Sequence, residues 1–353
     1  MQAWMRARQS VFRLLPVLVA LMPAGVPACS RGEPHVEGAI PIALERVALV
    51  VQESVPAAPI SSENDEFGFA RAADLVFDGD RMLVLENGND RIVRLDEQFR
   101  PEAYFGREGA GPGELRGAMS LAVWQDLYAV SEGTNARVSI FRSDGAFVRS
   151  LAVPHGFTEV QWGPDGSLFV CSYDDRNYFL RGDTAGPWRP FAERPWDLYP
   201  EEFRAMFRPI IHGDVQFVVA GTGAVHVYDE MLGSLVEYSP TGQRVAVRRL
   251  PQRILDGLIE QDALVLGDFG GDTRRARPGI TDLSVTDDGR LFLLFPNVGA
   301  IGLLVDPRTN RAQAIKWPAE ADQRYGGFGG VIRNGLFFRH SSDDVRIFKL
   351  IPE

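Results

Sequence analysis

Between Leu75 and Gly117, short apolar runs are separated by turn-forming residues. The runs LVF, MLVLE, RIVRL and EAYFG alternate apolar and polar positions, which is the two-residue period of a half-buried β-strand. The breaks contain Asp78-Gly79 and Asn87-Gly88, pairs that tolerate the positive φ angles of tight turns. Four such strands within about 40 residues predict one four-stranded antiparallel blade of a β-propeller.

The same unit recurs along the chain. The step Asn89–Ile92 reappears 46 residues later at Asn135–Val138, and EVQWGPDGSLFV, from Glu159, aligns without a gap on DLSVTDDGRLFL, from Asp282. One apolar residue opens the second strand of each copy: Leu83, Leu127, Leu168, Val225, Leu291 and Leu336. These copies predict an all-β, six-bladed propeller over residues 46–353, with no second domain. An unpaired edge strand would be exposed, so we expect the run RVALVVQ at 46–52 to close the last blade.

The repeats also resemble a known family. The residues that carry the resemblance are Asn89-Asp90-Arg91-Ile92, Asn135-Ala136-Arg137-Val138 and the glycine-rich loop Gly106–Leu115. They are similar to the repeats of the NHL-repeat and TolB-like six-bladed β-propellers of bacteria, including the lipoprotein type. The resemblance implies the fold and leaves the function open, because propellers host binding modules and enzymes alike.

The first 28 residues differ from the rest of the chain. Three arginines at 6, 8 and 13 precede the apolar run Leu14–Met22 and a stretch of small residues, which predicts a signal peptide over 1–28. Val26-Pro27-Ala28-Cys29 resembles a bacterial lipobox and implies lipidation of Cys29; because Pro27 departs from that pattern, plain cleavage near Ala28 is the alternative. We expect an exported protein of the bacterial cell envelope, which meets a membrane only through this lipid, with residues 29–45 as a polar tether.

The net charge limits the classes of partner that we expect, and the cysteine content limits the possible disulfides. The chain has 37 Lys plus Arg and 47 Asp plus Glu, and removal of residues 1–28 takes three arginines, so the remaining net charge is 34 − 47 = −13. Nucleic acid is excluded as an expected partner, because binding its backbone needs clustered cations. Cations or basic peptides and proteins fit better. Cys171 is the one cysteine besides Cys29, so we expect no disulfide inside the propeller. We also expect a monomer.

Acidic residues recur where the innermost strands begin. The matched positions read Asp74, Ser120, Glu159, Asp214, Asp282 and Gly329. Innermost strands start close to the central channel, so Asp74, Glu159, Asp214 and Asp282 are the candidate ligands of Ca²⁺ or another divalent cation. The alternative is that acids are common at strand ends because these ends meet solvent.

A second resemblance concerns the same position. Glu159-Val160-Gln161-Trp162, followed by Asp165-Gly166, resembles the first metal-ligand strand of gluconolactonase-like propellers. That resemblance implies a metal ligand at Glu159 and a lactonase-type activity. His212 and His340 are the two histidines expected to approach the mouth, so either is the candidate proton-transfer group of such an enzyme.

Two long connections are expected on the face of the acidic mouth, at 185–212 and 251–278. Long loops on a rigid scaffold are where binding residues concentrate. The residues expected on this ligand or partner face are Glu86, Glu132, Trp188, Trp196, His212 and His340. Alternatively, the two tryptophans pack between blades.

The sequence therefore leaves three hypotheses. The first is a non-enzymatic, exported or lipid-anchored propeller that binds a protein, a peptide or a small molecule on the face of the two long connections. The second is a divalent-metal-dependent hydrolase or lactonase at the channel mouth. The third is a purely structural role. No G-x-S-x-G elbow, phosphate-binding loop or His-Glu-x-x-His motif occurs, which disfavours several common enzyme classes.

Overall fold

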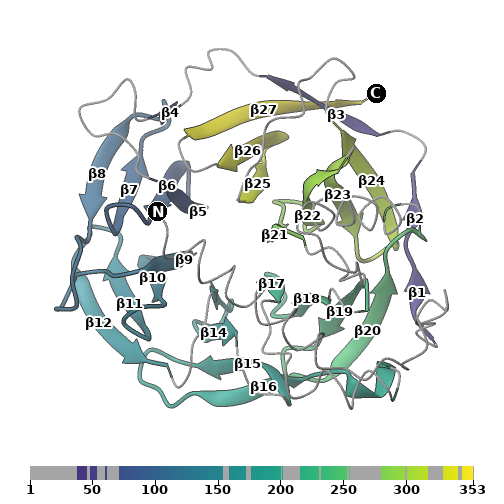
Figure 1. The fold of residues 1–353 in the computed structure, drawn as a ribbon, viewed down its shortest axis with the longest axis horizontal. Coiled ribbons are helices and arrows are strands. Elements are labelled where there is room, and N and C mark those ends of the chain that lie inside the picture. The colour runs from purple at the N-terminus through teal and green to yellow at the C-terminus, as the bar shows by residue number, and fades with distance from the viewer. Residues whose placement is uncertain are drawn as a thin grey trace, which may run out of the picture.

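The chain folds into short antiparallel strands arranged around a common centre (Figure 1). The structure, a computed structural model, describes residues 38–45, 48–53, 60–61, 71–153, 159–171, 176–199, 201, 215–229, 232–252, 254, 280–298, 300–316, 329–340 and 344–352. Within these ranges one helix has defined bounds, the 3-10 helix η2 (Trp196–Leu198). None of the described helices has the length and apolarity needed to span a bilayer. The all-β propeller prediction is confirmed.

Four sheets hold one repeat each, in sequence order from the inner to the outer strand. Sheet I contains β5 (Ala72–Asp78), β6 (Arg81–Glu86), β7 (Arg91–Leu95) and β8 (Pro101–Phe105). Sheet II contains β9 (Ala118–Trp124), β10 (Leu127–Glu132), β11 (Arg137–Arg142) and β12 (Phe147–Ala152). Sheet III contains β13 (Val160–Trp162), β14 (Leu168–Cys171), β15 (Asn177–Gly182) and β16 (Arg189–Glu193). Sheet IV contains β17 (Gln216–Val219), β18 (Val225–Asp229), β19 (Ser234–Tyr238) and β20 (Arg244–Arg249), with β1 (Ile40–Pro41) on its outer edge.

The remaining strands form one ten-stranded sheet, sheet V. Its first arm is β21 (Asp282–Val285), β22 (Leu291–Val298), β23 (Ala300–Asp306) and β24 (Arg311–Lys316). Its second arm is β25 (Gly329–Arg333), β26 (Leu336–His340) and β27 (Asp344–Pro352). The strand β3 (Leu49–Glu53) joins the arms, because it pairs in parallel with β24 and antiparallel with β27. The expected six separate blades therefore appear as four sheets and one fused sheet.

The N-terminal strands form a strap along the outer edges of sheets IV and V. After β1, which pairs in parallel with β20, β2 (Ala43–Leu44) pairs in parallel with β24, and β4 (Ile60–Ser61) pairs with β27. The expected closing strand at 46–52 corresponds to β3, one element of this strap. Residues 40–44, expected as part of a tether, instead belong to the propeller, because the outer strands offer unpaired backbone groups to any strand beside them.

Replacement of Ile42 by alanine should measure how firmly the strap is held. Ile42 is 4% exposed and packs in the core between sheets IV and V. We expect the Ile42→Ala protein to lose about 2 kcal/mol of unfolding free energy in urea titrations, through lost apolar burial and a residual cavity. Ile40→Ala is the control, since Ile40 is 38% exposed and should cost much less. Equal losses in the two variants would show that the strap contributes no specific packing.

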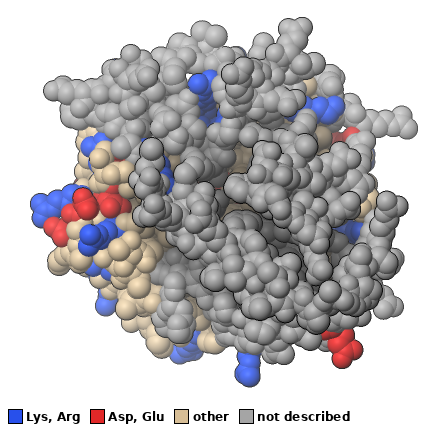
Figure 2. Space-filling view, in the orientation of Figure 1, with Lys and Arg blue, Asp and Glu red and all other residues tan. Residues whose placement is uncertain are grey.

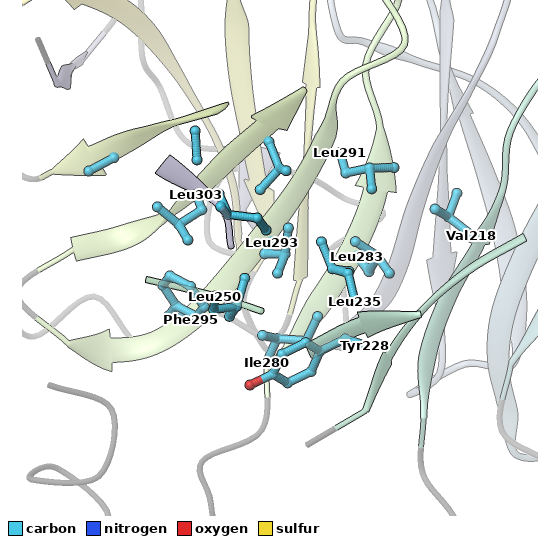
Figure 3. Close-up of a cluster of buried hydrophobic side chains, with 14 of the residues drawn as sticks. Val218, Tyr228, Leu235, Leu250, Ile280, Leu283, Leu291, Leu293, Phe295 and Leu303 are labelled. Carbon is cyan, nitrogen blue, oxygen red and sulfur yellow. The ribbon is translucent and has the colours of Figure 1, made fainter. Parts of the chain in front are cut away.

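The inner strands contact one another in the order β5, β9, β13, β17, β21 and β25, and β25 returns to β5 to close the ring. Buried apolar clusters fill the space between consecutive sheets. Figure 3 shows the cluster between sheets IV and V, where Leu283, Leu291 and Leu293 lie near Tyr228 and Leu235. Each buried leucine stabilises the fold by about 2 kcal/mol through removal from water. The ring is therefore held by side chains that interdigitate between sheets.

Candidate functional site

The inner strands bring one matched position of the repeats to the same end of the channel. Backbone pairing with the second strands places these residues at that position: Asp74, Ser120, Glu159, Gln216, Asp282 and Gly329. Asp74, Glu159 and Asp282 come from alternate positions around the ring. We call these three residues the channel mouth.

Blade four differs from the sequence-based alignment. We expected Asp214 at the matched position, but Phe217 pairs with Val227 as Val160 pairs with Val170, so Gln216 stands where Glu159 stands in sheet III. Asp214 itself lies outside the described residues. A shift of two residues keeps the same face of a strand, so the apolar pattern alone does not distinguish the two registers.

The matched side chains also tie neighbouring sheets together. Asp74 Oδ2 accepts the Leu121 N–H at 2.7 Å, and Asp282 Oδ2 accepts the Gly330 N–H at 2.8 Å. Each of these donors directly follows the matched residue of the next sheet or arm. Ser120 Oγ repeats the contact at 3.4 Å with the next sheet's backbone, and Glu159 reaches the Phe217 backbone in the same way. The side chain at the matched position thus links each inner strand to the next and helps to close the ring, with or without a ligand.

Burial raises the pKa of all three carboxyls at the channel mouth, and for Asp282 and Glu159 a neighbouring carboxyl adds to the shift. Burial, and then the charge of Asp74, raise the pKa of Asp282 to about 7. Burial, followed by the charges of Asp282 and Asp74, raises the pKa of Glu159 well above its ordinary value. Burial likewise raises the pKa of Asp74, although the Leu121 and Leu75 N–H groups oppose the shift. Near neutral pH the three groups are therefore not all ionised, and a nearby cation would favour their ionised forms.

The divalent-cation site stays a prediction. Within the described ranges, no three His, Cys, Asp or Glu side chains lie together as a metal-binding group. His212, like Asp214, lies outside these ranges, and His340 is described only by its backbone, which pairs with Gly329. Both oxygens of Asp74 already accept backbone N–H groups. The donor set at the mouth therefore fits a hydrated cation, held through its water, better than an ion bound directly by three carboxylates.

Glu86 and Glu132, expected on the ligand or partner face, are completely buried. Glu132 accepts hydrogen bonds from Asn135 and Ser139 and pairs with Arg137 at 2.8 Å. Glu86 is bound in the same way by Asn89 and Arg91. The Asn-x-Arg step that marks the repeat in the sequence therefore clasps the carboxylate that ends the second strand.

The same arginine organises the glycine-rich loop between sheets I and II. Arg137 donates to the carbonyl oxygens of Ala110, Gly111 and Glu114, and Asn135 donates to that of Gly109. The loop is thus a braced turn that connects β8 to β9, as expected from its lack of a phosphate-binding motif.

Trp188 and Trp196 are both half-buried and pack between sheets. Trp188 Nε1 donates to the Ala152 carbonyl oxygen at 2.8 Å, and Trp196 lies against Tyr199 with ring centroids 5.1 Å apart. The first long connection is also shorter than expected, because Arg189–Glu193 forms β16, the outer strand of sheet III. Pro190 made a strand here hard to predict from the sequence, because proline is unusual within sheets. It is tolerated on an edge strand, where its missing N–H would have no partner.

A buried polar cluster anchors the start of this connection. Asp229, at the end of β18, accepts the hydroxyl groups of Tyr178 and Tyr199 and the Leu232 N–H. The Arg194 guanidinium lies 4.7 Å from the centre of the Tyr178 ring. Asp229 was recognisable as an acid at a strand end, but nothing in the sequence indicated its tyrosine partners, because Tyr178 lies 51 residues away.

Several other ion pairs of the described residues are exposed to solvent. In Figure 2, described Lys, Arg, Asp and Glu side chains are visible near the edge of the molecule. The pair Arg142–Asp126, for example, has side chains that are 55% and 58% exposed. Solvent screens such pairs, so they contribute little to stability.

No family model matches the chain. The curated proteins contain no match to it either. Several solved structures share the fold. A candidate exported protein of Bacteroides fragilis is 12% identical, with a TM-score of 0.57, and the match covers 90% of this chain and 99% of that one.

Two of the similar structures are lyases. Virginiamycin B lyase of Staphylococcus aureus is 9% identical with a TM-score of 0.53, and the match covers 86% of this chain and 99% of the lyase. A streptogramin B lyase is 12% identical with a TM-score of 0.51, over 78% of each chain. At these identities the likeness shows the propeller fold and carries no activity across.

Proposed function

We propose that this protein is an exported β-propeller that binds a cationic ligand or partner at the channel mouth. The observation that carries the proposal is the position of Asp74, Glu159 and Asp282. Three carboxyls from alternate inner strands lie at one end of the channel, and burial raises the pKa of each. The charge of Asp74 adds to the shift of Asp282, and the charges of Asp282 and Asp74 add to the shift of Glu159. A bound cation would relieve this repulsion, and the net charge of the chain favours the same class of ligand.

The long connections support a site on this face. In each four-stranded antiparallel sheet, the outermost strand ends on the face where the next innermost strand begins. The ends of β16 and β20 therefore lie on the face of the channel mouth, as does the braced loop Gly106–Gly117, while most residues of the two connections that follow these strands are outside the described ranges. Loops on a rigid scaffold commonly carry the residues that recognise a partner.

We further propose six blades, with sheet V divided between β24 and β3, and membership of the NHL-repeat and TolB-like propellers. The sequential contacts of the inner strands and the clasped Asn-x-Arg steps support this proposal. We also propose that the chain is exported by the signal at 1–28, is lipidated at Cys29 and acts as a monomer in the cell envelope. The signal pattern in the sequence supports that part.

A metal-dependent hydrolase of the lactonase type is the second candidate. One observation favours it: the pKa of Glu159 is raised well above its ordinary value at the end of a channel, as is common for a general acid or base. In this candidate Glu159 would exchange a proton with the substrate, and the cation would polarise a carbonyl group when bound.

Calorimetric titration of the metal-free protein with Ca²⁺ tests the proposed site. We expect saturable binding with release of about half a proton to one proton per cation near pH 7, because Asp282 is partly protonated there. The proton count comes from repeating the titration in buffers of different ionisation enthalpy.

Asp282→Asn and Glu159→Gln should weaken binding, whereas Asp144→Asn, in an exposed turn, should leave it unchanged. Absence of both heat and proton release would contradict cation binding at the mouth. Binding followed by hydrolysis in a screen of lactones and esters would favour the second candidate.

A further inference from the structure

A shallow groove runs along the outer edge of β20. It is lined by Gly38, Ile40 and Leu198 together with residues 244–247. Val245 is 61% exposed and Ile40 is 38% exposed. Exposed apolar side chains that gather at one place commonly mark a contact surface.

The groove is uncovered because β1 pairs only with the end of β20. The parallel register joins Ile40 to Arg248 and Pro41 to Arg249. Residues 244–247 therefore have no strand on their outer side within the described part of the chain. The N-terminal segment turns at Gly38, whose φ is +77° and whose surroundings are open.

The groove also lies where the chain leads towards its proposed anchor. Gly38 is nine residues after Cys29. A fully extended chain spans about 3.3–3.6 Å per residue, so this tether reaches at most about 30 Å. A lipid on Cys29 would thus keep the groove within that distance of the bilayer surface.

We propose that this groove is a docking surface for the lipid bilayer, with Val245 and Ile40 inserted among the headgroups. The proposal rests on the lipidation of Cys29 proposed above. A short tether holds the two surfaces at high effective concentration, so a small apolar contact suffices. The β20 strand is at the perimeter of the ring (Figure 1), so this contact directs the channel mouth sideways, along the membrane.

The charges beside the groove indicate an apolar contact rather than attraction to anionic lipid. Arg244 is paired with both carboxylate oxygens of Asp197, at 2.7 and 2.6 Å. Arg248 is buried against Glu237. Because these arginines are already neutralised, and the chain after residue 28 is strongly acidic, we expect docking on zwitterionic phosphatidylcholine to be at least as strong as on anionic vesicles.

The test uses the chain from Cys29, purified with its natural lipid and placed on phosphatidylcholine vesicles that contain brominated lipid. A fluorophore is attached through Val245→Cys, with Val148→Cys as the matched control, both with Cys171→Ala. Val148 is 40% exposed on β12, away from the strap. We expect quenching at 245 to exceed quenching at 148 by about twofold or more, as for a side chain seated in the interface. Equal quenching at the two positions, or none at 245, overturns the proposal.

A second pair of variants separates docking from mere tethering. Ile40→Asp should abolish quenching of the probe at 245, whereas Ile351→Asp, at another exposed isoleucine, should preserve it. Hydrogen-exchange protection, without vesicles, of those amides of residues 244–247 that do not donate to β19 would instead indicate that a peptide segment or a second copy occupies the groove, and would overturn the lipid assignment.

The same experiment distinguishes failure of the anchor from failure of the groove. Mass spectrometry shows whether Cys29 carries lipid. If it does not, Cys29→Ser removes the free thiol that would also take the fluorophore, and a hexahistidine tag placed before residue 29 and bound to nickel-chelating lipid supplies the tether. Unequal quenching at 245 and 148 in that arm would support the groove although the lipidation proposal had failed, and equal quenching would overturn it.

Discussion

Glu132→Ala is expected to lower the free energy of unfolding by about 3–5 kcal/mol, because it leaves the Arg137 charge without its buried partner. The side chain of Glu132 is 0% exposed, and that of Arg137 is 14% exposed. Asn135, Ser139 and the Arg116 N–H also lose their acceptor. Urea denaturation followed by tryptophan fluorescence measures the loss.

Glu102→Ala is the matched control for this prediction. Glu102 also pairs with arginines, Arg81 at 3.2 Å and Arg94 at 3.0 Å, but its side chain is 37% exposed. We expect a loss of less than about 1 kcal/mol, as for other solvent-exposed pairs. If Glu132→Ala cost no more than Glu102→Ala, the Asn-x-Arg clasp would not be a stabilising element of the repeat.

Asp282→Asn is expected to stabilise the protein above pH 7 by on the order of 2–4 kcal/mol in the absence of divalent cations, while costing little near pH 4. Asparagine keeps an oxygen that can accept the Gly330 N–H but cannot ionise beside Asp74. The pKa of Asp282 is about 7 in the folded protein, against 3.8 as its ordinary value.

The sign of this effect follows from proton binding. Between pH 4 and 7 the folded state holds the Asp282 proton more tightly than the unfolded state, so the stability of the native sequence falls as the pH rises through this range. Unfolding curves at several pH values, with a chelator present, should therefore diverge between the native protein and the variant.

Asp96→Asn should show the opposite dependence on pH: the variant should be less stable than the native protein where Asp96 is ionised, and this loss should shrink as the pH falls. Hydrogen bonds from the Arg100 and Gln98 N–H groups and from the Arg100 side chain lower the pKa of Asp96, so its ionised form favours folding. If the difference in unfolding free energy between the native protein and Asp282→Asn did not change with pH, Asp282 would not be a carboxyl whose pKa is raised in the folded state.

Glu132 and Asp282 show that the two acidic positions of the repeat have different roles. Glu132 is paired and buried, so its charge is compensated inside sheet II. Asp282 accepts a hydrogen bond from Gly330 in the next arm, and the charge of Asp74 adds to the burial that raises its pKa. Uncompensated charge is what makes the channel mouth, rather than the end of the second strand, the better candidate for a cationic ligand.

The local elements of this fold follow from short stretches of sequence. Two-residue alternation marks the strands, and Gly79, at φ 59°, stands at the turn that the Asp78-Gly79 pair predicted. An N-terminal strand beside β27 was also foreseeable, because the last repeat lacked a strand. These features depend on neighbours in sequence, so a pattern of about ten residues contains the information.

Tertiary structure decided what depends on distant contacts. It placed Gln216 rather than Asp214 at the matched position, made β16 out of an expected insert, and fused the last two repeats through β3. It also buried Glu86 and Glu132, which the sequence presented as surface acids. Strand register, edge pairing and burial depend on contacts with the neighbouring sheet. The sequence of one repeat does not specify these contacts.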